Sequence, residues 1–208
     1  MTMGYRGKTT NSRREVVAVQ AQAEREAQWG EMPGTIVSFD PATQTATIQP
    51  TYKPLHNGDP VDMPELLEVP VRFARVGGFV ITSPVKAGDK VSLRPLMRSS
   101  ENFHSGEDYS ASNDTRSFSL SDMEAHLDGG EPLSDPIPGF NSSNMEIRSA
   151  DGQFAIEMSE DGKFRMRGAE GNWFDLIATG FELLGTEDSL VHQAEYAEIG
   201  AKLRGMAL

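Results

Sequence analysis

The chain has 208 residues, no cysteine, 20 glycines and 12 prolines, and a formal net charge of −12 at pH 7. This length allows one large domain or two small ones, and the lack of cysteine excludes a disulfide scaffold. The sequence has no apolar run near the roughly 20 residues of a transmembrane helix, and no signal-peptide pattern at its start. The acidic balance would repel nucleic-acid phosphates, and the frequent glycine and proline favour short strands, so we expect a mainly β protein with no nucleic-acid partner.

Residues 1–31 form the first predicted segment, an N-terminal helical arm. The stretch from Arg13 to Gln28 contains no glycine or proline and is rich in alanine, glutamine and glutamate, which favours a helix. Its apolar side chains are few and small, so they indicate either a frayed terminal helix or an arm that docks on a partner protein. The candidate docking residues are Val16, Val17, Val19, Ala23 and Trp29.

Residues 32–97 read as a series of short strands. Alternating residues at 34–39 and 43–49 flank Asp40-Pro41-Ala42, the spacing of a β-hairpin, and further strands are predicted at 67–73, 79–82 and 90–96. Five short strands favour a small barrel of the OB type, with a small immunoglobulin-like sandwich as the alternative. Gly77-Gly78 is not followed by the lysine of a phosphate-binding loop, so it indicates a bulge or a close backbone approach instead.

Residues 98–144 are predicted to be an acidic connecting loop. Between positions 99 and 136 the chain has nine acidic residues and one basic residue, Arg116. A polar stretch of this length without periodicity is typical of disorder or of a functional loop laid over other subunits. Leu120-Ser121-Asp122 and the segment 137–140 are its candidate anchor points.

Residues 145–173 repeat a strand pattern with a period of ten. Asp151-Gly152 and Asp161-Gly162 are turn sequences, and apolar and polar residues alternate between them, so each strand has one apolar and one charged face. A ribbon this small cannot enclose its own apolar face, which the barrel or identical ribbons from other chains must therefore cover. The candidate residues of a trimer core are Met145, Ile147, Phe154, Ile156, Met158, Phe164 and Met166.

The tail, residues 174–208, is predicted to be helical. Apolar residues are closely spaced from Phe174 to Leu184, and Tyr196, Ile199 and Leu203 follow a helical period. Glycines interrupt both stretches, so we expect short helices of low intrinsic stability that need neighbours.

The sequence contains no recognisable catalytic or metal-binding constellation. None of the four histidines, His56, His104, His126 and His192, has a second histidine at a metal-ligand spacing, and no Gly-x-Ser-x-Gly elbow occurs. The acidic residues gather in polar loops, where solvated charge is the ordinary interpretation. We therefore expect no enzyme activity and no cofactor.

Three blocks of sequence point to a known family. Residues 69–91 read VPVRFARVGGFVITSPVKAGDKV, residues 116–122 read RSFSLSD, and residues 136–140 read PIPGF. In this order they resemble the N-terminal domain of the central spike proteins of contractile phage tail baseplates, the family that includes the phage Mu spike. The positions that carry the resemblance are Pro70, Phe73, Gly77, Gly78, Phe79, Pro84, Gly88, Asp89, Leu120, Ser121, Asp122, Pro138 and Gly139.

The resemblance implies an OB-fold collar at 32–97, a short intertwined trimeric β-helix or β-prism at 145–173, and a helical C-terminal tip at 174–208. It implies a structural virion protein of the tail baseplate, assembled in the host cytoplasm. Such a homotrimer would anchor in the baseplate hub through residues 1–31 and be pressed against the host outer membrane when the sheath contracts. Several relatives hold an axial iron ion with a His-x-His motif, which is absent from this sequence.

Three other functions remain open at the level of sequence. One is the spike of a related contractile secretion system, which would have the same fold. Another is a cell-surface glycan-binding or hydrolytic module that uses the barrel and the acidic loop. The third is a monomeric adaptor, which a mass measurement in solution distinguishes from the trimer.

Overall fold

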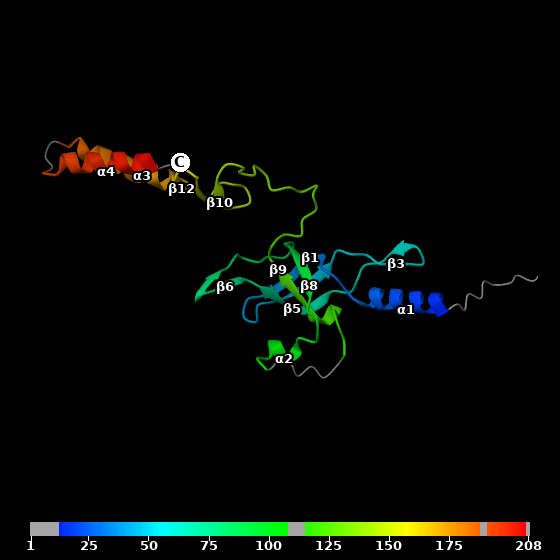
Figure 1. The fold of residues 1–208 in the computed structure, drawn as a ribbon. Helices are drawn as coiled ribbons and strands as arrows, with labels where there is room; N and C mark the ends of the chain where they lie inside the picture. Colours follow the sequence, from blue (N-terminus) through cyan, green and yellow to red (C-terminus); the bar gives the residue numbers. More distant parts are fainter. Residues whose placement is uncertain (1–12, 108–114, 188–190, 207–208) are drawn as a thin grey trace, which may run out of the picture. The chain divides into compact units, whose positions relative to one another are not determined.

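The computed structural model describes residues 13–107, 115–187 and 191–206. The chain divides into two compact units, residues 1–134 and residues 135–208. The first contains helix α1 (Arg13–Ala27) and a small β-barrel, and the second contains a β-ribbon followed by two helices (Figure 1). Among the described residues, no helix combines the length and the apolar character needed to cross a membrane.

Five strands close the barrel of the first unit. They follow the order β1-β2-β5-β9-β8 around the barrel, and β1 pairs with both β2 and β8. All neighbours are antiparallel except β5 and β9, which are parallel. This arrangement is an OB-like barrel, so the prediction of a mainly β protein with a five-stranded barrel is confirmed. The strands are β1 (Met32–Asp40), β2 (Thr45–Pro50), β5 (Leu66–Arg72), β8 (Lys90–Pro95) and β9 (Met123–His126).

Alternation of apolar and polar residues builds the barrel core. Ile48 on β2 and Val91 and Leu93 on β8 are fully buried, whereas their neighbours along each strand are partly exposed, as the two-residue period of a strand requires. Gly34 on β1 faces this core. A Cβ atom at that position would lie 2.7 Å from the Cγ2 of Ile48, so the barrel closes only because this residue has no side chain.

The identity of two predicted strands is corrected by the structure. The strand predicted at 79–82 forms, but it pairs with β6 (Ala74–Val76) as β7 (Phe79–Ile81) in a separate hairpin. Gly77 and Gly78 are the two residues of its turn, with φ of +58° and +81°, and no atom lies within 4 Å of a Cβ built at either. The expected bulge or close backbone approach is therefore wrong, because a tight hairpin turn needs positive φ at both positions.

The fifth barrel strand is β9, which lies inside the segment predicted to be a connecting loop. Its four residues, Met123 to His126, pair with both β5 and β8. The same segment contains helix α2 (Glu101–His104) and the 3-10 turn η1 (Leu120–Asp122). The strand escaped sequence analysis because only Met123 and Ala125 supply its apolar face, between acidic residues that normally indicate a solvated loop. A last, short hairpin joins β3 (Leu55–His56) to β4 (Asp59–Pro60).

The second unit begins with a four-stranded antiparallel ribbon. Its order is β10-β11-β12-β13, and the predicted Asp-Gly turns join the first three strands. The strands are β10 (Met145–Arg148), β11 (Ala155–Met158), β12 (Phe164–Gly168) and β13 (Gly171–Asn172). The three strands predicted from the ten-residue period therefore form in the described chain. Their winding with other copies into a trimeric β-helix or β-prism stays a prediction.

Two helices follow the ribbon, α3 (Trp173–Gly185) and α4 (Gln193–Met206), and they lie side by side (Figure 1). The predicted helical tail therefore forms, but its glycines do not interrupt it in the way the sequence suggested. Gly185 and Gly200 lie where the two helices meet. A Cβ on Gly185 would lie 2.9 Å from the backbone nitrogen of Ala197, and one on Gly200 3.1 Å from the backbone oxygen of Ala178. These glycines allow close helix packing, which offsets their low helix propensity.

Candidate functional site

The ribbon of the second unit gathers the predicted trimer-core residues onto one face. The register aligns Met145 with Met158, and Met158 with Phe164, in a row across the three strands. A second row aligns Ile147, Ile156 and Met166 in the same way. Because alternate residues of a strand point to the same side, both rows belong to one apolar face.

This apolar face is open in the single chain. The seven candidate residues, including Phe154 in the turn before β11, expose between 39% and 66% of their surface. A contiguous patch of large, exposed apolar side chains usually marks a surface that binds another molecule. The ribbon therefore presents an apolar surface that nothing in its own chain covers among the described residues.

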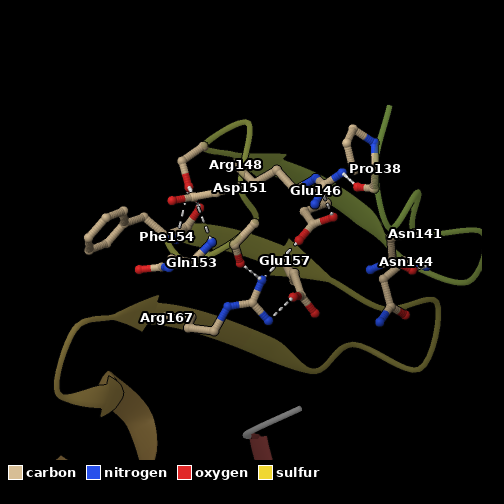
Figure 2. Close-up of polar contacts among 12 residues, drawn as sticks. Pro138, Asn141, Asn144, Glu146, Arg148, Asp151, Gln153, Phe154, Glu157 and Arg167 are labelled. Carbon is tan, nitrogen blue, oxygen red and sulfur yellow. Dashed lines mark hydrogen bonds and ion pairs between the residues drawn. The ribbon is translucent and has the colours of Figure 1, made fainter. Parts of the chain in front are cut away.

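The opposite face of the ribbon carries charges that are more deeply buried than the apolar residues. Glu157 exposes only 3% of its side chain and Glu146 only 9%. Arg167 bridges the two carboxylates, with Nη1 at 3.2 Å from Glu157 and Nη2 at 3.2 Å from Glu146 (Figure 2). Arg165 and Arg148 complete the set, at 3.4 Å from Glu157 and 3.3 Å from Glu146. We call these five residues the ionic face.

The segment 138–144 lines a polar cleft over the ionic face. Arg148 donates a hydrogen bond to the carbonyl oxygen of Pro138, and Figure 2 shows Asn141 and Asn144 on the same side as Glu146 and Glu157. Asn141 itself accepts the backbone amide of Asn144 at 3.0 Å, which holds the segment in a turn. Pro138 and its neighbour Gly139 were singled out by sequence, and in the structure both line this cleft.

The two Asp-Gly turns of the ribbon are built alike. In the first, the Ser149 hydroxyl donates to Asp151, and the amide of Phe154 donates back to the Ser149 oxygen at 3.1 Å. In the second, Ser159 makes the same contact with Asp161. The serine hydrogen bond holds the pKa of each aspartate below its ordinary value. Each turn thus carries its own side-chain hydrogen bonds, which favour the same strand register in both hairpins.

The candidate docking residues of the N-terminal arm divide into two groups. Val16, Val17 and Val19 on α1 are 56% to 69% exposed, and Ala23 is exposed as well. Trp29 instead packs against the barrel core, and its amide donates to the carbonyl oxygen of Phe118 at 2.9 Å. The helix therefore has an open apolar stripe, whereas Trp29 attaches the end of the arm to the barrel.

The β6–β7 hairpin carries a second exposed apolar surface. Val76 and Phe79 form the last pair before the turn and are 80% and 81% exposed, and Ile81 is 70% exposed. The resemblance positions Gly77, Gly78 and Phe79 therefore lie together at the tip of this hairpin.

The remaining resemblance positions of the first unit support the barrel. Phe73 follows β5, and its ring lies edge-on to the ring of Phe39, with 6.3 Å between the centroids. Asp89 closes the turn before β8 by accepting a backbone amide at 2.8 Å, and Gly88 takes the positive φ of +98° that the turn requires. Pro70 lies within β5, and Pro84 is exposed in the loop between β7 and β8.

Asp122 in η1 is a buried ionic anchor. Its neighbour Leu120 packs against the barrel core and Ser121 is exposed, but the Asp122 side chain is only 1% exposed. Arg116 donates Nε to its Oδ2 at 2.8 Å, and the amide of Ser100 donates to its Oδ1 at 2.9 Å. Burial raises the pKa of Asp122, but the hydrogen bonds from Arg116 and Ser100 outweigh it, so the pKa lies below its ordinary value.

A second buried carboxylate, Glu124 on β9, forms an ion pair with Arg72 on β5. His104 and His126 lie 3.7 Å and 3.9 Å from its oxygens. Burial, with a contribution from nearby arginines, lowers the pKa of both histidines. Sequence analysis missed this cluster because its members come from three elements far apart in the chain.

The described residues contain no group of three or more histidine, cysteine, aspartate or glutamate side chains arranged to hold a metal ion. His192 is 60% exposed, and its Nδ1 lies 3.2 Å from Glu195 in the same chain. The expectation that the protein has no cofactor stays a prediction.

Residues 32–127 match the family model of the phage protein Gp138 N-terminal domain. The match begins at the first residue of β1 and ends one residue after β9, so it spans the closed barrel. It supports a phage structural protein and a component of the virion. No curated protein matches the chain.

Proposed function

We propose that the protein is the trimeric central spike at the distal end of a contractile phage tail baseplate. In this role it contacts the host outer membrane and punctures it when the sheath contracts. The match of the barrel to a phage protein domain supports a virion component. The observation that carries the proposal further is the ribbon, whose large apolar side chains are exposed while the carboxylates of its ionic face are buried.

In the ribbon, charged side chains are buried and apolar side chains are exposed, which is the reverse of the usual arrangement. A chain that worked as a monomer would gain by exposing Glu157 and burying Ile156, yet it does the opposite. Fully burying a large apolar side chain contributes about 1.5–3 kcal/mol, and the seven candidates are about half exposed. Covering them would therefore contribute about 1 kcal/mol for each side chain. Two further copies of the same ribbon, related by a threefold axis, supply an equally apolar cover.

The edges of the ribbon support intertwined copies. In the described chain, β10 pairs only with β11, and β13 is two residues long. An unpaired strand edge offers backbone donors and acceptors to another chain. Pairing those edges between copies closes the sheet, which gives the stiffness that a membrane-puncturing device needs.

The proposed spike acts mechanically and without catalysis. Its most buried carboxylates are committed to arginine partners: Asp122 to Arg116, Glu124 to Arg72, and Glu157 to Arg165 and Arg167. A catalytic carboxylate must instead reach its substrate. The exposed apolar stripe of α1 is the proposed contact with the baseplate hub.

Labelling of virions tests the location. Antibodies raised against the purified chain, with gold-conjugated secondary antibodies, should mark the distal end of the tail in particles of the phage that encodes it. Label on the head, or on no part of the virion, would contradict the proposal. Turnover of peptidoglycan or lipopolysaccharide by the purified protein, lost when one carboxylate is replaced, would favour the hydrolytic module instead.

A further inference from the structure

Helix α3 has one side that is packed against α4 in the same chain. Ala178 on this side is fully buried, and the ring of Phe181 stacks on Tyr196 of α4 with 6.3 Å between centroids. Near the C-terminal end of α4, Arg204 forms ion pairs with Asp175 at 2.7 Å and Glu182 at 2.9 Å, both on α3. These contacts with α4 occupy one side of α3 and leave the opposite side exposed.

The other side of α3 is an apolar stripe without a cover in the described chain. Its members recur with the three- and four-residue spacing of a heptad, which places them on one side of a helix of 3.6 residues per turn. All are between 40% and 65% exposed, and Gly180 lies in the middle of the stripe. The large residues are Trp173, Leu176, Ile177, Leu183 and Leu184.

The stripe continues the apolar face of the ribbon. Trp173 is the first residue of α3, and it lines one hollow together with Ile147, Phe154, Ile156 and Met166. The apolar surface of the ribbon therefore extends onto the start of the helix. Whatever covers the ribbon reaches the start of α3.

We propose that the α3 helices of three copies pack their apolar stripes against one another in a parallel three-helix bundle that closes the end of the spike. The inference rests on the proposed trimer. Helices that run along a threefold axis are parallel to one another by symmetry. The stripe occupies three positions of each heptad, which is wider than the two-position seam of a two-stranded coiled coil. Gly180 allows the helix backbones to approach closely. The α4 helices form the outer layer, where pairs such as Lys202 and Glu198 are exposed.

Single cysteines test the bundle cleanly, because the chain has none of its own. In the full chain, Leu176→Cys places one thiol per copy at the proposed axis, and Glu198→Cys places it on the outside of α4. Oxidation should link two of the three chains in the Leu176→Cys protein, seen as a doubled mass on a non-reducing denaturing gel. The rate should not depend on protein concentration, and Glu198→Cys should remain unlinked.

The outcomes separate the bundle from the trimer itself. A Leu176→Cys protein that is trimeric in solution but fails to link would overturn the bundle and leave the spike in place. Linking that speeds up with protein concentration would also overturn it, since it would arise from collisions between particles. A monomeric protein would remove the trimer on which both proposals depend.

Discussion

The substitution Ile156→Glu places a carboxylate in the centre of the ribbon's apolar face. Ile156 lies between Ile147 and Met166 in its row and is 52% exposed in the single chain. A monomer would tolerate the change, because the new side chain would point into water. In the proposed trimer, three carboxylates would be buried close to one another.

The expected loss follows from two contributions. Covering the exposed half of an isoleucine contributes about 1 kcal/mol per chain, or about 3 kcal/mol per trimer. Burying an unpaired carboxylate costs several kcal/mol per ion, which adds about 10 kcal/mol for three. Since about 1.4 kcal/mol corresponds to a factor of ten, the assembly constant should fall by at least about nine orders of magnitude.

Sedimentation velocity and thermal unfolding of the full chain measure this effect. The Ile156→Glu protein should sediment as a monomer where the parent sediments as a trimer, and it should recover in part at acidic pH because burial raises the pKa of a carboxyl group. Val191→Glu is the matched control, since Val191 is also β-branched but is 92% exposed. If Ile156→Glu assembled as stably as the parent and the control, the apolar face would not be the interface.

Three further predictions concern the parts that hold each unit together. Replacing Asp122 with alanine removes the buried carboxylate partner of Arg116 and should lower the free energy of unfolding, measured in urea, by about 3 kcal/mol. Because the pKa of Asp122 is lowered in the fold, the stabilisation that it contributes should be present near neutrality and lost as the pH falls through that pKa. His104 and His126 have lowered pKa values in the fold, so as the pH falls the unfolded chain binds protons at these histidines before the folded chain does. The stability of the fold should therefore decline below about pH 6.5. Changing both histidines to glutamine should make this decline smaller in melting temperatures measured over a series of pH values. Gly185→Ala places a Cβ 2.9 Å from the backbone nitrogen of Ala197 and should lower the melting temperature. In the control Gly205→Ala, the new Cβ meets nothing within 4 Å, so this change should be neutral or stabilising by up to about 1 kcal/mol. A greater loss of stability from Gly205→Ala than from Gly185→Ala would contradict this packing.

The parts of the fold that sequence could predict are those with a regular local pattern. The hairpin of β1 and β2, the strand β8 and the ten-residue repeat of the ribbon all alternate apolar and polar residues over at least four positions, and each forms as expected. Strand β9 could not be found in this way. It buries Glu124, and the partner that makes this tolerable is Arg72, which is 52 residues earlier in the chain.

The candidate site shows the same limit. The apolar rows were predictable from alternation, because each strand supplies its own residues. The charged face was predictable in the same way, but the burial of Glu157 was not, since it depends on Arg165 and Arg167 across the strand pair and on the segment 138–144. Gly185 and Gly200 likewise read as helix breakers until the close contact of α3 with α4 explains them. Contacts between separate elements decide these features, and such contacts leave no periodic mark in the sequence.

The mass of the unmodified full chain in solution tests the central claim most directly. Light scattering coupled to size-exclusion chromatography should give about 68 kDa, three times the 22.7 kDa of one chain. The value should hold on dilution, because the proposed interface is shared strand pairing and a continuous apolar core. A mass of 22.7 kDa, with the apolar face of the ribbon still open to solvent, would contradict the trimeric spike.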